Sequence, residues 1–277
     1  MSRNVLSITT TDQDRPIRVI QVSDCHLFES CDTELLGMNT EESFQAVIDL
    51  IKKENSDKKL SLFVATGDIA QTPSERTYAR FLDKMQTFEE PCVWLQGNHD
   101  LNDLFLAQQN HAANMNIITL GNQWLIVMLN SSIDYEITGH FTEEELLWLA
   151  KQLSHYPDRH IIIAMHHNPI QVQSKWLDQT GLSNADDFWT IVDQAPQVKA
   201  VIHGHIHQNF EFTRGSVKVW ACPSTCIQFK PLCDSFTLDN LPPGYRWFDL
   251  YTNGQINTGI SRLASMPAGL DFNSSGY

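Results

Sequence analysis

Five short polar segments, each directly following a run of β-forming residues, constrain the fold of this chain more than any other feature. They are Asp24-Cys25-His26, Gly67-Asp68, Gly97-Asn98-His99-Asp100, Met165-His166-His167 and Gly204-His205-Ile206-His207. In open α/β sheets, sites form at the carboxyl ends of strands, so segments that are distant in sequence can converge on one edge. We therefore expect an α/β fold that collects these side chains at the edge of its sheets.

The residue types in these segments indicate a metal centre. A lone His or Asp in a turn is usually a helix cap or a solvated side chain, but five such segments together are a stronger signal. Imidazole nitrogens with carboxylate and amide oxygens suit Zn, Mn, Fe or Co. Cys222 and Cys226 enclose Pro223 and have no second pair after them, so a closed structural zinc site is not expected. The sequence predicts a catalytic metal centre.

Strands and helices alternate along most of the chain. Apolar and β-branched runs predict strands at Ile17–Val22, Leu60–Ala65, 92–95, 124–129, 160–165 and Val198–His203. Helices are expected at Thr40–Glu54, at 73–85 with Pro73 in the first turn, at 142–153 behind a Thr142/Glu145 capping box, and at 184–194. Glu211–Arg214, Val217–Ala221 and 245–250 are typical of hairpin strands, so the last third should be β-rich.

Composition limits the remaining choices. A chain of 277 residues with 42% hydrophobic residues can form one domain, 1–277, with a tail from 264 that we expect to be mobile. The net charge of -14 repels phosphate backbones, which argues against nucleic acid as a partner. No apolar run is long enough for a membrane span or a signal peptide, so we expect a cytoplasmic protein with its six cysteines reduced.

The motif set D-x-H, G-D, G-N-H-D, H-H-x-P and G-H-x-H, in this order from Asp24 through His207, resembles that of the calcineurin-like metallophosphoesterase superfamily. The stretches 36–40, 91–95 and 223–231 extend the resemblance to the bacterial class III 3′,5′-cyclic-AMP phosphodiesterases over nearly the whole chain. This resemblance implies a four-layer α/β/β/α sandwich with a dimetal site at one edge of the sheets.

The resemblance also implies seven ligands for two divalent or mixed-valence ions, with Fe, Mn and Zn all compatible. It assigns Asp24, His26 and His207 to one ion, Asn98, His166 and His205 to the other, and Asp68 to both. Spacing alone does not divide the ligands in this way. By formal charge, two carboxylates and two divalent ions leave the site at roughly +2, which attracts an anionic phosphoester despite the acidic surface.

The implied reaction is hydrolysis of cyclic AMP to 5′-AMP by a metal-bridging hydroxide, with His26, Asp68, Asn98, His99 and His166 contacting the substrate. His99 is the predicted general acid, because the departing alkoxide needs a proton. The aromatic ring of Phe229 is expected beside the adenine. The alternatives are a broader phosphodiesterase, acting on glycerophosphodiesters or 2′,3′-cyclic nucleotides, and a metal-binding scaffold without turnover. The sequence carries no signal for the oligomeric state.

Several neighbouring residues allow two interpretations. His167 begins an H-x-P pattern and is the alternative to His166 as a ligand, whereas His203 precedes the glycine and suits a place behind the ligands or in the core. Asp100 either orients His99 or caps a helix starting at Leu101, and the cap is favoured. We expect Cys25 to be a structural thiol. His111, His140, His155 and His160 have no motif around them and are expected on the surface or satisfied in the interior.

Overall fold

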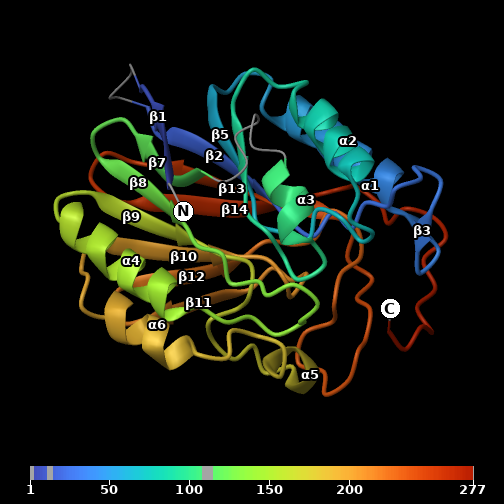
Figure 1. Cartoon of the computed structure of the whole chain (residues 1–277). Helices are drawn as coiled ribbons and strands as arrows, with labels where there is room; N and C mark the ends of the chain where they lie inside the picture. Colours follow the sequence, from blue (N-terminus) through green and yellow to red (C-terminus); the bar gives the residue numbers. More distant parts are fainter. Residues whose placement is uncertain (1–2, 11–14, 108–114, 277) are drawn as a thin grey trace.

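Two β-sheets are stacked in this protein, with helices on both outer sides (Figure 1). The computed structural model describes residues 3–10, 15–107 and 115–276. The seven-stranded sheet has the order β1 (Asn4–Ile8), β7 (Met115–Leu120), β8 (Trp124–Met128), β9 (His160–Ala164), β10 (Val198–His203), β12 (Val217–Ala221) and β11 (Glu211–Arg214). The five-stranded sheet has the order β14 (Ile256–Arg262), β13 (Gly244–Leu250), β2 (Ile17–Val22), β5 (Leu60–Ala65) and β6 (Cys92–Trp94).

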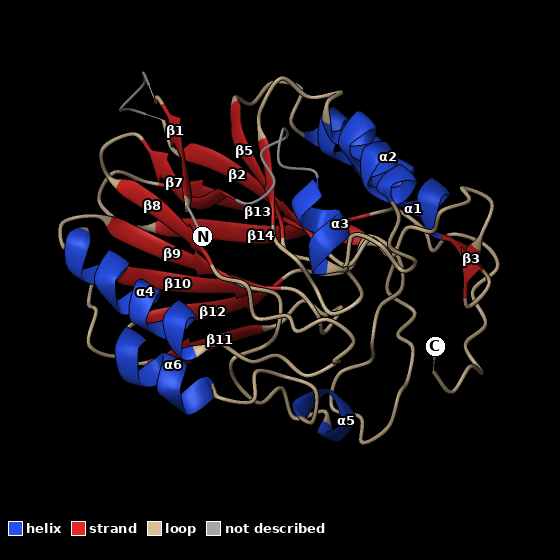
Figure 2. Cartoon of the chain, viewed as in Figure 1, coloured by secondary structure: helices blue, strands red, loops and turns tan. Residues whose placement is uncertain are grey.

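The described helices are α1 (Thr40–Glu54), α2 (Glu75–Met85), α3 (Asn102–Ala107), α4 (Glu143–His155), α5 (Lys175–Asp178) and α6 (Ala185–Val192). A small hairpin, β3 (Glu34–Leu35) with β4 (Met38–Asn39), precedes α1. Figure 2 shows α1 and α2 on one side of the strands and α4 and α6 on the other. The chain therefore forms an α/β/β/α sandwich, as predicted.

Alternating side chains build the core of this sandwich. In the five-stranded sheet, Val19 and Val64 face the other sheet, while Ile20 and Phe63 pack in the cluster that includes α1 and α2. Residues i and i+1 of a strand point to opposite faces, so a strand buried on both sides reads as one continuous apolar run. This explains why the central strands were evident in the sequence.

Parallel pairing orients the strands that carry the motifs. β2, β5 and β6 are mutually parallel in one sheet, and β8, β9, β10 and β12 are parallel in the other. The carboxyl ends of parallel strands lie at the same edge of a sheet, so the loops that follow them are brought together.

One helix start and one capping box differ from the prediction. α2 begins at Glu75 because Ser74 is its N-cap, with the hydroxyl accepting from the Thr77 amide at 3.1 Å. Pro73 therefore precedes the cap, and its predicted place in the first turn was wrong. At α4, Thr142 caps the helix as expected, but the Glu145 carboxylate accepts from Arg3 at 2.6 Å, so the expected capping box is only half formed.

The β-rich end of the chain is arranged differently from the expectation. β11 and β12 form the expected antiparallel hairpin. β13 is also a hairpin strand, as predicted, but its partner is β14, a strand that was not predicted, and this hairpin lies in the other sheet beside β2. The strands β1, β3, β4 and β7 were also missed.

The segment from residue 264 onward contacts the core at several points. The Asp271 amide donates to the Leu36 carbonyl oxygen at 2.9 Å, and Met266 and Leu270 pack against a buried cluster that includes Leu35 and Met38. Tyr277 lies outside the described residues. The single-domain organisation and the mobility of the rest of this tail stay predictions. Within the described ranges, no helix is long and apolar enough to cross a membrane. The cytoplasmic location also stays a prediction.

Candidate metal centre

Five loops meet at one edge of the sandwich. They follow β2, β5 and β6 of the five-stranded sheet and β9 and β10 of the seven-stranded sheet. Backbone hydrogen bonds join them: the Asp24 amide donates to the Gly67 carbonyl oxygen at 3.0 Å, and the Gly204 amide to the His166 carbonyl oxygen at 3.1 Å. The site is thus a direct product of the parallel strand arrangement.

The backbone of these loops is unusual. Positive φ angles occur at Asp24 (54°), His26 (48°), Asp68 (50°), His205 (68°) and His207 (48°). The left-handed region is uncommon for residues other than glycine, and such conformations cost roughly 1–3 kcal/mol each. Strain of this kind clusters at functional sites, and here it falls on five of the seven predicted ligands.

Three predicted ligands form a first group. The Nε2 atoms of His26 and His207 lie 3.1 Å apart, and His207 Nε2 lies 3.4 Å from Asp24 Oδ1. The other ring nitrogens have partners outside the group: Nδ1 of His26 lies 2.6 Å from Gln71 Oε1, and Nδ1 of His207 lies 2.9 Å from the Ile227 carbonyl oxygen. These bonds direct both Nε2 atoms towards Asp24.

Three more form a second group around Asn98. Its Oδ1 lies 3.0 Å from His166 Nε2 and 3.0 Å from His205 Nδ1. Nδ1 of His166 lies 2.7 Å from the Thr66 carbonyl oxygen, and Nε2 of His205 lies 3.1 Å from the Thr180 hydroxyl group. Metal-binding histidines are commonly oriented in this way by a bond from the second ring nitrogen.

Asp68 lies between the two groups. Its Oδ2 is 3.4 Å from His166 Nε2 and 3.8 Å from His26 Nε2. Its Oδ1 accepts from the His99 amide at 2.8 Å, which fixes the direction of the carboxylate. One oxygen of Asp68 therefore faces both groups, the arrangement that a bridging ligand requires.

Glycines make this close approach sterically feasible. A Cβ atom on Gly97 would lie 2.2 Å from the amide nitrogen and from Oδ1 of Asp68. Gly67 has a φ of 94°, and a Cβ there would lie 2.5 Å from His166 Nδ1. Gly67 and Gly97 are needed because the neighbouring backbone and side chains occupy the space that a Cβ atom would take.

The electrostatics suit cation binding. Burial favours the neutral form of Asp68, but the neighbouring histidines His166, His99 and His26 together outweigh it and hold the Asp68 pKa well below its usual range. Burial also favours the neutral form of Asp24, but His207 and His166 act in the opposite direction, and the Asp24 pKa is lowered. Burial lowers the pKa of His26 to about 3. The carboxylates are thus ionised and His26 is neutral, which are the forms that bind metal.

The donors fit a transition-metal ion. Asp24, His26 and His207 each place one ligand atom within 4.8 Å of the other two. Asp24, Asp68 and His166 form a second group with the same property. Asp24 Oδ2 is buried with no hydrogen-bond partner among the described residues. A buried, unpaired carboxylate oxygen is costly unless a cation satisfies it. All seven predicted ligands are brought together here, and their role as ligands stays a prediction.

The two alternative histidines have other partners. His167 Nδ1 lies 2.8 Å from the Ser131 hydroxyl group, and Nε2 lies 3.0 Å from the Ile137 carbonyl oxygen. Both nitrogens of a neutral imidazole are then in use, so the geometry favours His166 over His167. His203 is fully buried, and its Nδ1 lies 2.9 Å from the Gly204 carbonyl oxygen, in line with a place in the core.

His99 lies next to the first ligand group. It is partly exposed, and its ring centroid is 4.9 Å from that of His26. Asp100 does not cap a helix, so that interpretation was wrong: α3 begins at Asn102, whose amide donates to Asp134 Oδ1 at 3.0 Å. The buried Asp100 carboxylate instead accepts from the Tyr78 hydroxyl group at 3.0 Å and from backbone amides of the 67–70 and 97–100 loops.

The histidines without a motif have ordinary surroundings. His140 bonds to the Ser183 hydroxyl group at 3.0 Å, and His155 and His160 pack against neighbouring aromatic rings. His111 lies outside the described residues. None of the three described ones is among the groups of possible metal ligands found in the described chain.

Some supporting residues were missed from the sequence. Gln71 bonds to a ring nitrogen of His26 and Thr180 bonds to a ring nitrogen of His205, but neither residue belongs to a motif. Phe229, expected beside adenine, is only 4% exposed and stacks on His207 with ring centroids 4.1 Å apart. The arrangement does not support the adenine contact. The stretch 223–231 instead holds His207 and, through the Ser224 hydroxyl group, the Asp24 carbonyl oxygen at 2.7 Å.

The calcineurin-like phosphoesterase family model matches residues 17–209, the span that contains the whole metal centre. The chain belongs to this family. It is 38% identical over 263 residues to the 3′,5′-cyclic adenosine monophosphate phosphodiesterase CpdA of Escherichia coli (strain K12), covering 94% of this chain and 95% of that protein. The CpdA of Vibrio vulnificus (strain CMCP6) is 38% identical over 269 residues, covering 96% and 97%.

More distant relatives agree with this placement. A 3′,5′-cyclic-nucleotide phosphodiesterase of Nostoc sp. is 33% identical over 254 residues, covering 90% of this chain and 93% of that protein. Among solved structures, a dimetal phosphatase from Danio rerio has a TM-score of 0.69 at 13% identity and covers 94% of this chain and 100% of its own. At that identity the structural likeness shows the fold alone.

Proposed function

We propose that this protein hydrolyses 3′,5′-cyclic AMP to 5′-AMP. One observation carries the proposal: seven oriented ligand-type side chains converge in a chain that is similar over 94% of its length to a cyclic-AMP phosphodiesterase. The prediction of a metal-dependent cyclic-nucleotide phosphodiesterase is confirmed at the level of that class. Cyclic AMP as the particular substrate is our proposal.

The proposed cofactors are two transition-metal ions. Asp24, His26 and His207 would hold one, Asn98, His166 and His205 the other, and Asp68 both. When bound, the ions supply Lewis-acid stabilisation of the phosphoryl oxygens and a lowered pKa for the attacking water. Fe, Mn and Zn all suit this donor set.

The partly exposed residues suggest where the substrate enters. Asn98 and His99 are less buried than the other site residues and lie at the solvent side of the ligand groups. We propose that the cyclic phosphate binds there, against His26, Asp68, Asn98 and His166. His99 would then give its ring proton to the departing 3′-oxygen.

A turnover panel tests the substrate assignment. The metal-loaded protein is assayed with 3′,5′-cyclic AMP, 2′,3′-cyclic AMP, a glycerophosphodiester and 5′-AMP, and kcat/KM is compared. We expect 3′,5′-cyclic AMP to have the highest value. A higher value for the glycerophosphodiester or the 2′,3′-cyclic nucleotide would replace our proposal with the broader phosphodiesterase, and no turnover of any substrate would support the scaffold.

A further inference from the structure

The loops after β5 and β6 carry the predicted bridging ligand and the predicted general acid, and each loop holds the other through a carboxylate. Asp68, after β5, accepts from the His99 amide at 2.8 Å. Asp100, after β6, accepts in return from the Ile69 and Ala70 amides at 3.3 and 3.0 Å. Asp68 is a predicted ligand, whereas Asp100 belongs to none of the groups of possible metal ligands among the described residues.

The bonding capacity of the Asp100 carboxylate is fully used. Oδ1 accepts from the Ala70 amide and from the Tyr78 hydroxyl group, each at 3.0 Å. Oδ2 accepts from the Ile69 and Gly97 amides at 3.3 and 2.9 Å. All four neighbours are donors, which matches the ionised, acceptor-only form with its roughly four lone-pair sites. Asp100 is only 1% exposed, so bulk water would not replace a lost bond.

We propose that Asp100 is a positioning residue, which holds the two loops at the separation that a shared ligand requires. Its carboxylate binds the backbone of the two residues after Asp68 and of the residue before Asn98. With the loops held in this way, Asp68 Oδ2 lies 3.4 Å from His166 Nε2 and 3.8 Å from His26 Nε2. The inference rests on the proposed metal-dependent function and assigns a role to a residue that is not itself a predicted ligand.

A carboxamide cannot replace this carboxylate. Asp100→Asn offers one acceptor oxygen and an NH₂ group that donates. In place of Oδ1, the NH₂ group would face the Ala70 amide, and in place of Oδ2 it would face the Ile69 and Gly97 amides. At least one buried amide then has no acceptor in either orientation, so the loops should move apart. Tyr78→Phe removes only the donor from α2 and leaves all three amide bonds.

Calorimetric titration of the metal-free protein with Mn²⁺ tests the proposal. The wild type should bind two ions, and Asp100→Asn should bind at least one of them about 10–100-fold more weakly, because a predicted bridging ligand has lost its support. Tyr78→Phe should bind both ions as the wild type does.

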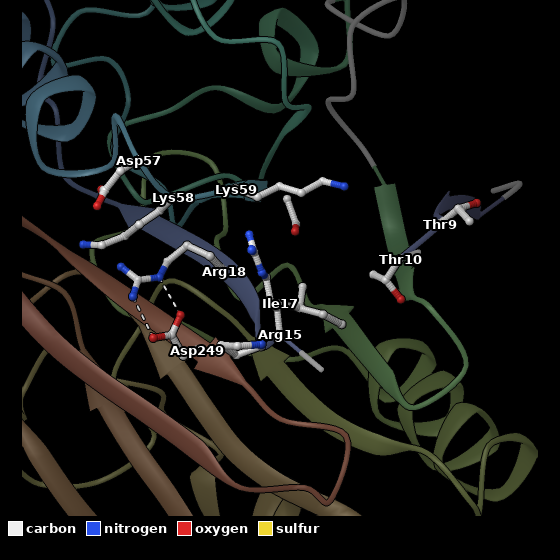
Figure 3. A pocket seen from close by; sticks show the side chains of 11 residues that line it. Thr9, Thr10, Arg15, Ile17, Arg18, Asp57, Lys58, Lys59 and Asp249 are labelled. Carbon is white, nitrogen blue, oxygen red and sulfur yellow. Dashed lines mark hydrogen bonds and ion pairs between the residues drawn. The ribbon is translucent and has the colours of Figure 1, made fainter. Parts of the chain in front are cut away.

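The matched control is Asp249→Asn, the same change near the start of β2, at the end of the five-stranded sheet away from the metal centre. There Asp249 accepts from Arg18 Nε at 2.5 Å (Figure 3). The control should lose stability and keep the Mn²⁺ affinity of the wild type. Urea unfolding of the metal-free proteins gives the stability of each variant.

A general structural role predicts that Asp100→Asn is destabilised but binds Mn²⁺ as tightly as the wild type, and this result would overturn the proposal. Equal weakening in Tyr78→Phe would also overturn it, since the support would then come from α2. Asp100→Glu is the test variant if Asp100→Asn does not fold. It keeps an acceptor-only carboxylate, but the longer side chain should shift the loops and weaken Mn²⁺ binding, and wild-type affinity would count against the proposal.

The outcome is separable from that of the substrate panel. If the wild type binds two Mn²⁺ ions without hydrolysing 3′,5′-cyclic AMP, and Asp100→Asn binds them more weakly, the proposed substrate fails and the role of Asp100 stands. If every variant binds Mn²⁺ alike while the wild type hydrolyses 3′,5′-cyclic AMP, the role of Asp100 fails and the proposed function stands.

Discussion

At the scale of single residues, the chemistry of the site depends on how the backbone places a few side chains. His99 and Asp68 are linked directly, because the His99 amide donates to Asp68 Oδ1 while the His99 ring stands at the solvent side of the site. The same residue therefore orients a predicted bridging ligand through its backbone and offers a proton through its side chain. Substitution of the side chain can separate the two roles.

His99→Ala should lower kcat for 3′,5′-cyclic AMP by about 10²–10⁴-fold, because a ribose alkoxide leaves poorly without a proton donor. A nitrophenolate leaves without protonation, so bis(4-nitrophenyl) phosphate should be hydrolysed with a much smaller loss. The measurement is kcat on both substrates at equal metal content. Equal losses on the two substrates would argue that His99 positions the phosphate or the metals instead.

Gly97→Ala should weaken metal binding on the order of 10–100-fold, because the added methyl group would displace the Asp68 carboxylate. Gly215→Ala is the control: its φ is also positive, at 59°, but a Cβ there meets nothing within 4 Å. The control should lose some stability and keep its metal. Metal content after dialysis, measured by elemental analysis, distinguishes the two, and a full metal complement in Gly97→Ala would show that the loop adapts.

At the scale of elements, the sequence predicted the central strands, which are buried on both faces, and missed the poorly buried edge strands β1 and β14, although the exposed hairpin strand β11 was predicted. β2, β5 and β10 have their predicted bounds because each is a short run of mainly apolar, β-forming residues. β14, with the sequence INTGISR, has no buried residue and lies at a sheet edge. Neither an alternation of apolar and polar residues nor a high content of β-forming residues identifies it as a strand. β1 is likewise an edge strand that is largely exposed.

The same reasoning explains what could be predicted of the site. All seven ligand-type residues follow strands, and the ends of these strands can be predicted from the sequence. The left-handed backbone conformations of Asp24, Asp68 and His205 could not be predicted from the sequence, because tertiary contacts select that conformation for a non-glycine residue. The carbonyl oxygens of Thr66 and Ile227, which orient His166 and His207, could not be predicted either, because every residue has a carbonyl oxygen.

Ser74→Ala should lower the free energy of unfolding by about 1 kcal/mol, because the α2 cap loses its bond to the Thr77 amide. Ser74→Asp should restore most of this loss, since Asp is an equally good N-cap. Urea unfolding of the three proteins gives the comparison. An unchanged midpoint in Ser74→Ala would mean that Pro73, rather than the cap, determines where the helix starts.

At the scale of the whole molecule, the two-sheet core determines which thiols can react. Cys25, Cys222 and Cys226 are buried, whereas Cys31 is exposed. Burial raises the pKa of Cys222 and Cys226 to about 12, and it raises that of Cys25 well above its usual value. Only a thiolate is nucleophilic, so these three should be inert while the protein is folded.

Treatment of the folded protein with a disulfide reagent at about pH 8 should therefore label Cys31 first. Cys25, Cys222 and Cys226 should react only at the rate of unfolding, and mass spectrometry of peptides after timed quenching would show the order. Rapid labelling of Cys25 in the folded state would mean that the loop carrying Asp24 and His26 opens far more readily than its packing indicates.

The whole molecule brings six ligand-type side chains from loops of two sheets around the carboxylate of Asp68, the predicted bridging ligand, and our central claim is that this centre works with two ions. The most direct measurement is a metal titration of chelated protein, following kcat for 3′,5′-cyclic AMP against the number of ions bound per chain. Activity should be restored fully only at two ions per chain, and Asp68→Ala should recover neither ion binding nor activity. Full activity at one ion per chain, or undiminished turnover after exhaustive chelation, would contradict the account.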